Sequence, residues 1–481
     1  MQINSPDFKN SSKKALDNPG LQKALGNLRN GFPVKRANAV QRMPEFELLR
    51  NEGRDIKNHV IANLDFYLEE FETNVTKNGG NVHWACDAED ARKAILDICQ
   101  KANAKTVTKG KSMVSEEINL NEYLESNGVQ PVETDLGEYI LQLREDHPSH
   151  IIAPAIHLNL DDVSSIFSEK HGTPHTSDPA ALMQEAREVL RDKFVAADVG
   201  ITGANFCVAE TGSTIIVTNE GNGDLTQTLP RVHIVITTID KVVPTLEDMS
   251  LFLRLLARSA TGQEFTVYNT LSTGPRREND ADGPEEYHVV LLDNGRSEMI
   301  GTQFQDMLRC IRCSACMNHC PVYGAVGGHA YGWVYPGPMG SVLTPKLIGI
   351  EKSGHLPNAS TFCGKCESVC PVHIPLPKMM RHWREKEFEK HLSPKGFRFG
   401  IGTWAYFAKR PALYRWLARA SAFSLKLMGG KSRRIRSLPL KNGWTAWRDL
   451  PAPEGGTFMD QWKKNQSTET SPSHPDNKCR S

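Results

Sequence analysis

Four cysteines stand close together in one short stretch, and their spacing is typical of iron–sulfur ligands. The stretch reads Cys310-Ile-Arg-Cys313-Ser-Ala-Cys316-Met-Asn-His-Cys320-Pro, which follows the pattern C-x2-C-x2-C-x3-C-P of a [4Fe–4S] loop. Three thiolates spaced in this way can surround one face of a cubane cluster, whereas the fourth, before the proline, points elsewhere. The pattern therefore predicts a loop that binds iron and sulfide.

A second, shorter motif, Cys363-Gly-Lys-Cys366-Glu-Ser-Val-Cys370-Pro, repeats the end of the first. Structural zinc sites pair two C-x2-C units into a tetrahedron. The 2-2-3 spacing of the first motif places too many thiolates on one side for that arrangement. Disulfides are disfavoured as well, because the clustered cysteines number seven and no signal peptide precedes them. We therefore expect two [4Fe–4S] clusters shared by the two motifs.

Aligning the motifs on their prolines assigns the ligands, since in two-cluster ferredoxins the cysteine before the proline binds the other cluster. The first cluster takes Cys310, Cys313, Cys316 and Cys370, and the second takes Cys320, Cys363 and Cys366. The missing ligand of the second cluster falls on Ser360. Ser360 could bind weakly, the position could stay open, or Ser360 could cap the next turn while His355 or His373 closes the site. We predict one robust cluster and one that is labile to oxidation.

The overall charge excludes one class of partner. The 481 residues carry 57 Lys and Arg against 56 Asp and Glu, a net charge of +1, so there is no global field that would gather nucleic acid. The N-terminus lacks the basic and apolar segments of a signal peptide, and no apolar run reaches the length of a membrane span. We therefore expect a cytoplasmic protein that does not bind nucleic acid.

The elements that must position the cysteines fall into distinct regions. We expect a helical N-terminal arm over 1–78, an α/β domain over 79–297, an α-helical ferredoxin-type domain over 298–385, a basic aromatic helical region over 386–465 and a disordered tail over 466–481. Between the two motifs, the Gly- and Tyr-rich residues 321–362 could cover the clusters, dock a redox partner or form a structural wrap.

Alternating strand and helix patterns predict the α/β domain and a mostly parallel sheet. Asp87 is a plausible N-cap for a helix over 88–101. A further helix is expected over 115–125, with strands over the β-branched or apolar runs 106–108, 129–134, 208–217, 232–237 and 287–292.

Several spaced motifs in this region resemble those of the lactate-utilization domain. They are 108–118 (TKGKSMVSEEI), 133–138 (ETDLGE), 200–205 (GITGAN), 209–213 (AETGS) and 219–222 (NEGN). Together with both cysteine motifs and 337–345 (GPMGSVLTP), they make residues 40–465 similar to the lactate utilization protein B family. The resemblance implies a CoA-transferase-like or ribose-5-phosphate-isomerase-like fold, and an electron-transport role in oxidising L-lactate to pyruvate beside partner subunits.

Two residues of the α/β domain are candidates for chemistry. Glu210 lies in Ala-Glu-Thr-Gly at the start of an apolar run, and a carboxylate there could act as nucleophile or base, although capping local N–H groups is the preferred interpretation. Lys111 follows a strand in Lys-Gly-Lys-Ser and could bind an anion. The favoured function is an electron-transfer subunit with an unidentified redox acceptor. The alternative is an enzyme whose α/β domain itself binds and transforms a small carboxylate or acyl substrate.

The basic aromatic region suggests a surface contact. Aromatic residues alternate with Arg and Lys over 397–419, a composition that suits the surface of a membrane. Glycines and Pro411 interrupt the amphipathic pattern, so packing of a helical hairpin on the ferredoxin-type domain is the preferred interpretation.

Overall fold

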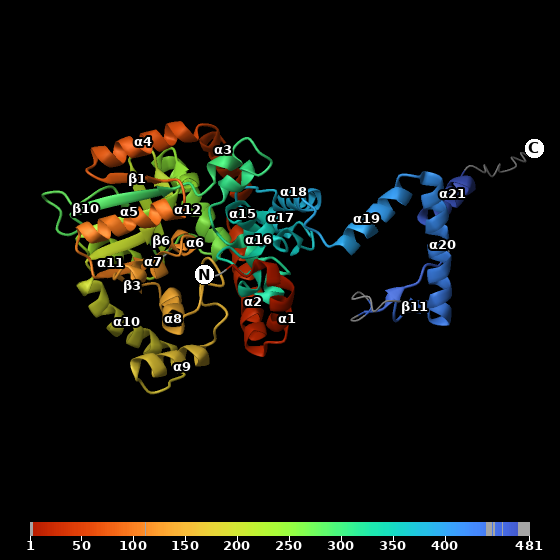
Figure 1. Ribbon diagram of the computed structural model, residues 1–481, viewed down its shortest axis with the longest axis horizontal. Coiled ribbons are helices and arrows are strands. Elements are labelled where there is room, and N and C mark those ends of the chain that lie inside the picture. Colours follow the sequence, from red (N-terminus) through yellow and green to blue (C-terminus); the bar gives the residue numbers. More distant parts are fainter. Residues whose placement is uncertain (1–2, 111, 439–444, 446–447, 455, 470–481) are drawn as a thin grey trace, which may run out of the picture. The chain divides into compact units, whose positions relative to one another are not determined.

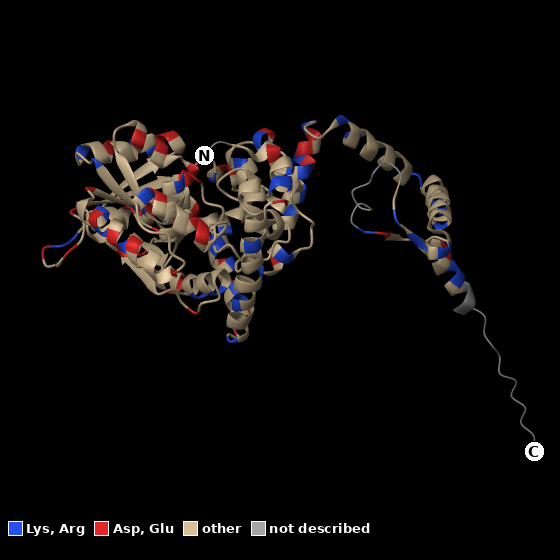
Figure 2. Cartoon of the chain, turned by 90° about the horizontal axis from the view of Figure 1, so that it is seen from below, with Lys and Arg blue, Asp and Glu red and all other residues tan. Residues whose placement is uncertain are grey.

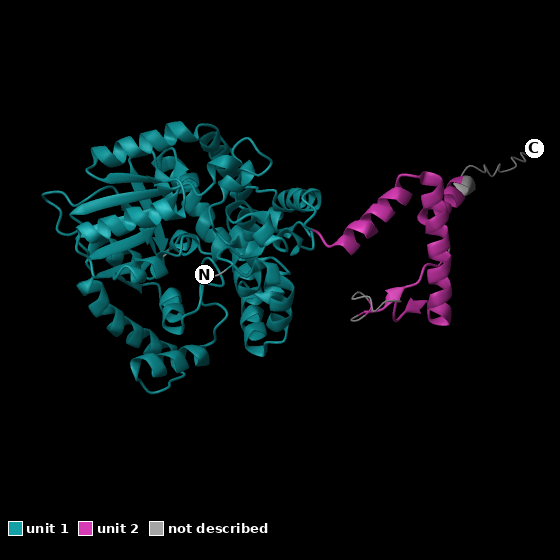
Figure 3. Cartoon of the chain, viewed as in Figure 1, with its two compact units in different colours: residues 1–392 teal, residues 393–481 magenta. Residues whose placement is uncertain are grey.

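The computed structural model describes residues 3–110, 112–438, 445, 448–454 and 456–469. The chain divides into two compact units, Met1–Leu392 and Ser393–Ser481 (Figure 3). The first unit contains the sheet and both cysteine motifs (Figure 1). The boundaries predicted within this unit stay predictions.

The N-terminal region is helical. Its helices are α1 (Phe8–Leu16), α2 (Pro19–Gln41), α3 (Phe46–Ala62) and α4 (Leu64–Lys77). Asn18 caps α2, because its side chain accepts a hydrogen bond from the Leu21 N–H, and Pro19 fits the first helical position. Gly79, with φ +90°, turns the chain after α4 toward the first strand.

A six-stranded parallel sheet in the order β1-β10-β7-β4-β2-β3 forms the centre of the unit. Its strands are β1 (Asn81–Ala85), β2 (Thr106–Gly110), β3 (Gln130–Glu133), β4 (Val199–Gly203), β7 (Val232–Thr238) and β10 (Glu286–Leu292). Alternate residues of β10 face opposite layers: Val289 and Leu291 pack with α4, and Val290 and Leu292 pack with α5 (Ala88–Lys101). The predicted α/β class with a parallel sheet is confirmed.

The α5 helix begins as predicted, since the Asp87 side chain accepts hydrogen bonds from the N–H groups of Glu89 and Asp90. The helix expected over 115–125 is instead two short helices, α6 (Met113–Glu117) and α7 (Leu120–Ser126). They are separated at Asn119, which has φ +50°, a conformation that asparagine tolerates better than most residues. Other helices of the domain are α8 (Leu136–Arg144), α9 (Leu160–His171), α10 (Pro179–Ala196), α11 (Asn222–Thr228) and α12 (Leu246–Ala260).

A smaller sheet in the order β8-β5-β6-β9 adjoins α12. Its strands are β5 (Phe206–Val208), β6 (Ser213–Thr218), β8 (Val242–Val243) and β9 (Tyr268–Ser272). The run 208–217 is therefore not one strand. Gly212, with φ +66°, turns the chain so that β5 and β6 pair antiparallel. A Cβ at Gly212 would lie 2.4 Å from the backbone nitrogen of Val75, so this close approach also requires glycine.

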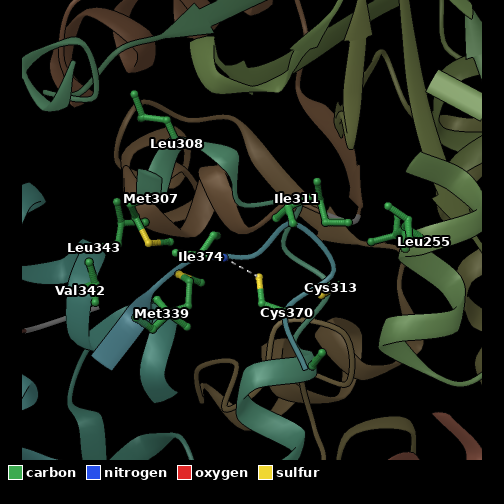
Figure 4. Packing of buried hydrophobic residues seen from close by; sticks show 14 of the residues in the cluster. Leu255, Met307, Leu308, Ile311, Cys313, Met339, Val342, Leu343, Cys370 and Ile374 are labelled. Carbon is green, nitrogen blue, oxygen red and sulfur yellow. Dashed lines mark hydrogen bonds between the residues drawn. The ribbon is translucent and has the colours of Figure 1, made fainter. Parts of the chain in front are cut away.

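The cysteine region consists of short helices joined by tight turns. They are α13 (Ala315–Asn318), α14 (Tyr323–Val326), α15 (Gly337–Leu347), α16 (Ile350–Ser353), α17 (Lys365–Ser368) and α18 (Leu376–Glu389). One hydrophobic core joins this region to α12, through residues such as Leu255, Met339 and Cys370 (Figure 4). Tyr331 and Tyr335 are fully buried, so residues 321–362 include a structural wrap.

The second unit contains α19 (Lys395–Ala408), α20 (Pro411–Gly429), α21 (Phe458–Glu469) and the strand pair β11 (Arg434–Ile435) and β12 (Leu450–Pro451). The predicted tail, 466–481, begins inside α21, and its residues 470–481 lie outside the described part of the chain. None of the helices in the described residues has the length and apolar character needed to cross a bilayer.

Candidate functional site

Four cysteines from both motifs line one cavity, which we call the four-cysteine cavity. Cys310, Cys313, Cys316 and Cys370 border about 410 Å³ of empty space. Arg312 and Ser314 have φ of +59° and +62°, and these left-handed residues turn the loop between its cysteines. The structure thus brings together the four residues that the sequence register predicts for the first cluster.

The walls of the four-cysteine cavity are apolar. Ile311, Met317, Met339, Ile374 and Leu376 are almost completely buried around it. Figure 4 shows Cys313 and Cys370 on neighbouring segments, and the Ile374 N–H donates to the Cys370 sulfur over 3.4 Å. Water is largely excluded, and backbone donors are available to sulfur, as iron–sulfur sites require.

The thiols fit a cationic metal centre. Burial raises the pKa of Cys313 to about 12, and burial together with the neighbouring thiols raises the pKa of Cys316 well above its usual range. Four thiolates around one apolar cavity are stable together only when positive charge compensates them, and iron ions supply such charge. The donor set therefore fits a [4Fe–4S] cluster.

Basic side chains contact the backbone carbonyls of the segments that form the four-cysteine cavity. Arg50 donates to the Cys370 carbonyl through Nη2 at 2.7 Å and Nε at 3.0 Å. Lys241 Nζ donates to the Cys310 carbonyl at 2.9 Å, and Arg36 Nη2 donates to the Val369 carbonyl at 3.0 Å. These cations fix the cysteine-bearing segments and would offset the negative charge of a cluster.

The remaining three cysteines form the second cysteine set. Burial raises the pKa of Cys366 to about 12, and the neighbouring thiols of Cys320 and Cys363 add to the shift. Burial has the largest effect on the pKa of Cys316, followed by the thiols of Cys313 and Cys310, and the Cys366 thiol also raises it, so the two sets adjoin. Cys363 is exposed, whereas Cys366 is buried.

The predicted fourth ligands of the second set differ in their surroundings. Ser360 Oγ accepts the Phe362 N–H at 3.1 Å and so caps the turn immediately before Cys363. His373 follows Cys370 of the four-cysteine cavity, and its Nδ1 lies 3.5 Å from Arg50 Nη2. His355 is partly buried, and its carbonyl accepts the Asn358 N–H. The fourth ligand stays a prediction.

The two candidates in the α/β domain lie apart from the cysteines in sequence. Glu210 is exposed, and its Oε2 accepts the Leu246 N–H at 3.1 Å at the start of α12. This contact corresponds to the capping role preferred from the sequence. Lys111 lies outside the described residues.

A buried polar network that sequence reasoning missed joins the α/β domain to the wrap. Arg296 Nη2 lies 2.6 Å from Glu117 Oε2, and Arg296 Nε lies 3.3 Å from Asp240 Oδ1. Tyr335 also donates to Glu117 Oε2, at 2.6 Å. The only indication of this network in the sequence was that Glu117 lies within the motif 108–118, because the partners of Glu117 are distant in sequence.

His150 links the α/β domain to the first cysteine loop. Its Nε2 and the Asn318 Oδ1 are 2.8 Å apart, and its Nδ1 accepts the N–H groups of Ile152 and Ala153. The Asn318 side chain in turn donates to the Ala260 carbonyl. Burial lowers the pKa of His150 from 6.5 to about 4, so the folded state holds this imidazole neutral.

This histidine should make stability depend on pH. Because the unfolded chain binds the proton below pH 6.5 and the folded chain only near pH 4, stability falls as the pH decreases through this window. His150→Gln should reduce the loss between pH 7.5 and pH 5 by about 2 kcal/mol, measured by anaerobic urea unfolding at both pH values. His175→Gln, at an exposed histidine, should leave the loss unchanged. Equal losses in wild type and His150→Gln would exclude this role.

Comparison with known proteins identifies both parts of the first unit. Residues 68–292 match the LUD domain, and residues 306–374 match the 4Fe-4S dicluster domain. The predicted pair of [4Fe–4S] clusters is therefore confirmed as the cofactor class.

Curated relatives match almost the whole chain. "Uncharacterized electron transport protein YkgF" of Escherichia coli is 42% identical over 98% of this chain and 99% of its own length. "Lactate utilization protein B" of Bacillus licheniformis is 43% identical and that of Bacillus subtilis is 42% identical, each over 98% of both chains. A LUD domain, a dicluster domain and full-length similarity of this degree place the chain in the lactate utilization protein B family.

Proposed function

We propose that this chain is an iron–sulfur electron-transfer subunit in the oxidation of L-lactate to pyruvate. In this proposal the first cluster is held by Cys310, Cys313, Cys316 and Cys370, and the second by Cys320, Cys363 and Cys366. The observation that carries the proposal is the four-cysteine cavity, which combines three cysteines of one motif with one of the other. The names of the relatives support the pathway.

The side chains around the cysteines suit a carrier of electrons. When bound, [4Fe–4S] clusters exchange single electrons with little structural change. The apolar wall of Ile311, Met317 and Leu376 keeps water from the first site. The proximity of Cys316 to Cys366 supports a short path between the two sites, so that electrons pass through both to a downstream acceptor.

A partner must start the reaction. The sequence contains no G-x-G-x-x-G fingerprint for a nicotinamide or flavin nucleotide, and oxidation of an alcohol carbon removes two electrons together with protons. We therefore propose that the other lactate-utilization subunits act with this chain. A reducing cytoplasm suits an iron–sulfur site with an exposed cysteine such as Cys363.

The second unit offers a surface for such contacts. Residues 393–436 contain eleven Lys and Arg and no Asp or Glu; the Lys and Arg positions are blue in the cartoon of Figure 2. α19 contains no buried residue despite Phe399, Trp404 and Tyr406. We assign the contact with the other subunits to this unit. Peripheral contact with an anionic membrane would use the same side chains.

Deletion of the gene tests the pathway. In a strain without another L-lactate oxidase, deletion should abolish growth on L-lactate, because electrons from lactate would lose their carrier. The wild-type gene and Cys99→Ala, which changes a buried cysteine of α5 outside both motifs, should restore growth, whereas Cys370→Ala should not. Undiminished growth of the deletion strain on L-lactate would refute the assignment.

A further inference from the structure

A second, larger cavity opens where the parallel strands end, and we call it the strand-end cavity. It has about 1,090 Å³ of empty space, including its open mouth. Its lining includes Ser112, Asp135 and Asn205, which follow the carboxyl ends of β2, β3 and β4. In open α/β sheets this edge is the usual place for ligands. Leu256 and Ala260 of α12 contribute apolar wall on another side.

Two cations also line the strand-end cavity. Lys241 Nζ donates to the Cys310 carbonyl and lies 3.6 Å from Asp240 Oδ2. The Arg312 guanidinium lies 4.9 Å from the centroid of the Tyr335 ring, and its Nη1 lies 3.2 Å from the Met339 sulfur. Among the described residues, no carboxylate forms an ion pair with Arg312.

The groups in contact with these cations carry excess positive charge, although two carboxylates, Asp135 and Glu138, also line the strand-end cavity. Asp240 and Glu117 are the two carboxylates of the group, and Arg296 already contacts both. Lys57 adds another buried cation, whose Nζ donates to the Asp240 and Val242 carbonyls. Four cations, Lys57, Lys241, Arg296 and Arg312, therefore face two carboxylates. Buried charge requires compensation: a cluster beside Cys310 would provide part of it, and an anion in the cavity would add to it.

The strand-end cavity adjoins the four-cysteine cavity. Arg312 and Ile151 line both, so a single layer of side chains separates them there. A charged ligand in the strand-end cavity would change the electrostatic environment of the cysteines, because charges interact strongly across such short, poorly solvated distances.

We propose that the strand-end cavity binds a small organic carboxylate, with Lys241 and Arg312 as partners of its carboxylate group. The apolar wall of Leu256 and Ala260 suits a short carbon chain, and the polar lining suits a hydroxyl or oxo substituent. The choice of L-lactate and pyruvate as the class rests on the proposed function. Lys241 and Arg312 favour a negatively charged ligand independently of that choice.

Anaerobic titration calorimetry of the iron-loaded full chain tests the ligand class. L-lactate and pyruvate should bind saturably, and L-lactamide, which lacks the negative charge, should bind at least about tenfold more weakly. Saturating L-lactate should also shift the EPR spectrum of the dithionite-reduced protein, whereas L-lactamide should not. Equal binding of L-lactate and L-lactamide, or no binding of either acid, would overturn the proposal.

Three variants locate the site. Lys241→Met should weaken L-lactate binding about tenfold or more with unchanged iron content. Lys57→Met is the matched control, because it removes a buried cation of the same group that does not line the cavity, and it should weaken binding much less than Lys241→Met does. If Lys241→Met loses iron, Ala204→Phe decides, since it fills the cavity without changing charge and should abolish binding. Equal weakening by Lys57→Met, or full binding by Ala204→Phe, would refute this location.

The outcomes separate this inference from the proposed function. If the deletion strain fails to grow on L-lactate but the loaded chain binds no acid, only the cavity assignment fails. If the chain binds L-lactate with the predicted dependence on Lys241 and the deletion strain still grows, the pathway assignment fails and the site stands.

Discussion

Cys316→Ala should lower the iron content from about eight to about four or fewer iron ions per chain, because two [4Fe–4S] clusters contain about eight. Cys316 lines the four-cysteine cavity, where alanine would leave three thiols. Its position beside Cys366 makes additional loss from the second cluster an expected consequence. Iron and sulfide analysis of anaerobically purified protein measures the change.

Cys99→Ala is the matched control for this variant. Cys99 is fully buried, and it lies in α5, where it packs against the parallel sheet. Its replacement should leave the iron content unchanged and lower stability by about 1 kcal/mol. A Cys316→Ala protein with the full wild-type iron content would show that this thiol is not a ligand, and zinc in place of iron in the wild type would reject the cluster assignment.

Ser360→Cys should suppress the three-iron EPR signal that air exposure produces in the wild-type protein. Three cysteines leave one iron of the second cluster without a thiolate, and that iron is the first to be lost on oxidation. Ser360 lies at the predicted fourth position, and its hydroxyl caps the turn before Cys363. A thiolate at this position should retain the fourth iron.

Thr361→Cys is the matched control, since it adds a thiol to the same segment at an exposed neighbouring residue. The control should keep the three-iron signal after the same exposure to air. Two clusters that are equally stable to oxygen in the wild type would argue decisively against this register. Suppression by Thr361→Cys to the same extent would show that any nearby thiol suffices.

The features that were predicted correctly from the sequence each follow from a local pattern of residues. Cysteine spacing within each motif is set by the loop that surrounds a cluster, so the four-cysteine cavity could be anticipated from Cys310 and Cys370 although they are distant in sequence. The parallel sheet followed from apolar strands alternating with helices, and the start of α5 followed from Asp87. Each prediction rests on the pattern of residues within one motif or one element.

Features created by long-range packing could not be read from the sequence. Lys241 precedes β8 and Arg312 belongs to the cysteine loop, and only the packing of the α/β domain on that loop brings them to one cavity. The β5–β6 hairpin was missed because the short turn Ala209-Glu-Thr-Gly212 was included in one predicted strand, whereas the left-handed conformation of Gly212 reverses the chain there. Asn119 divided a helix for the same reason, through one left-handed residue.

The most direct measurement combines this chain with its partner subunits and L-lactate. The native complex, purified without oxygen, is mixed with L-lactate, frozen at intervals and followed by EPR for reduced [4Fe–4S] signals. We expect these signals to appear during turnover in the complex and to be absent when this chain alone is mixed with L-lactate. A complex that oxidises L-lactate while the clusters of this chain stay oxidised throughout would contradict the proposed electron-transfer function.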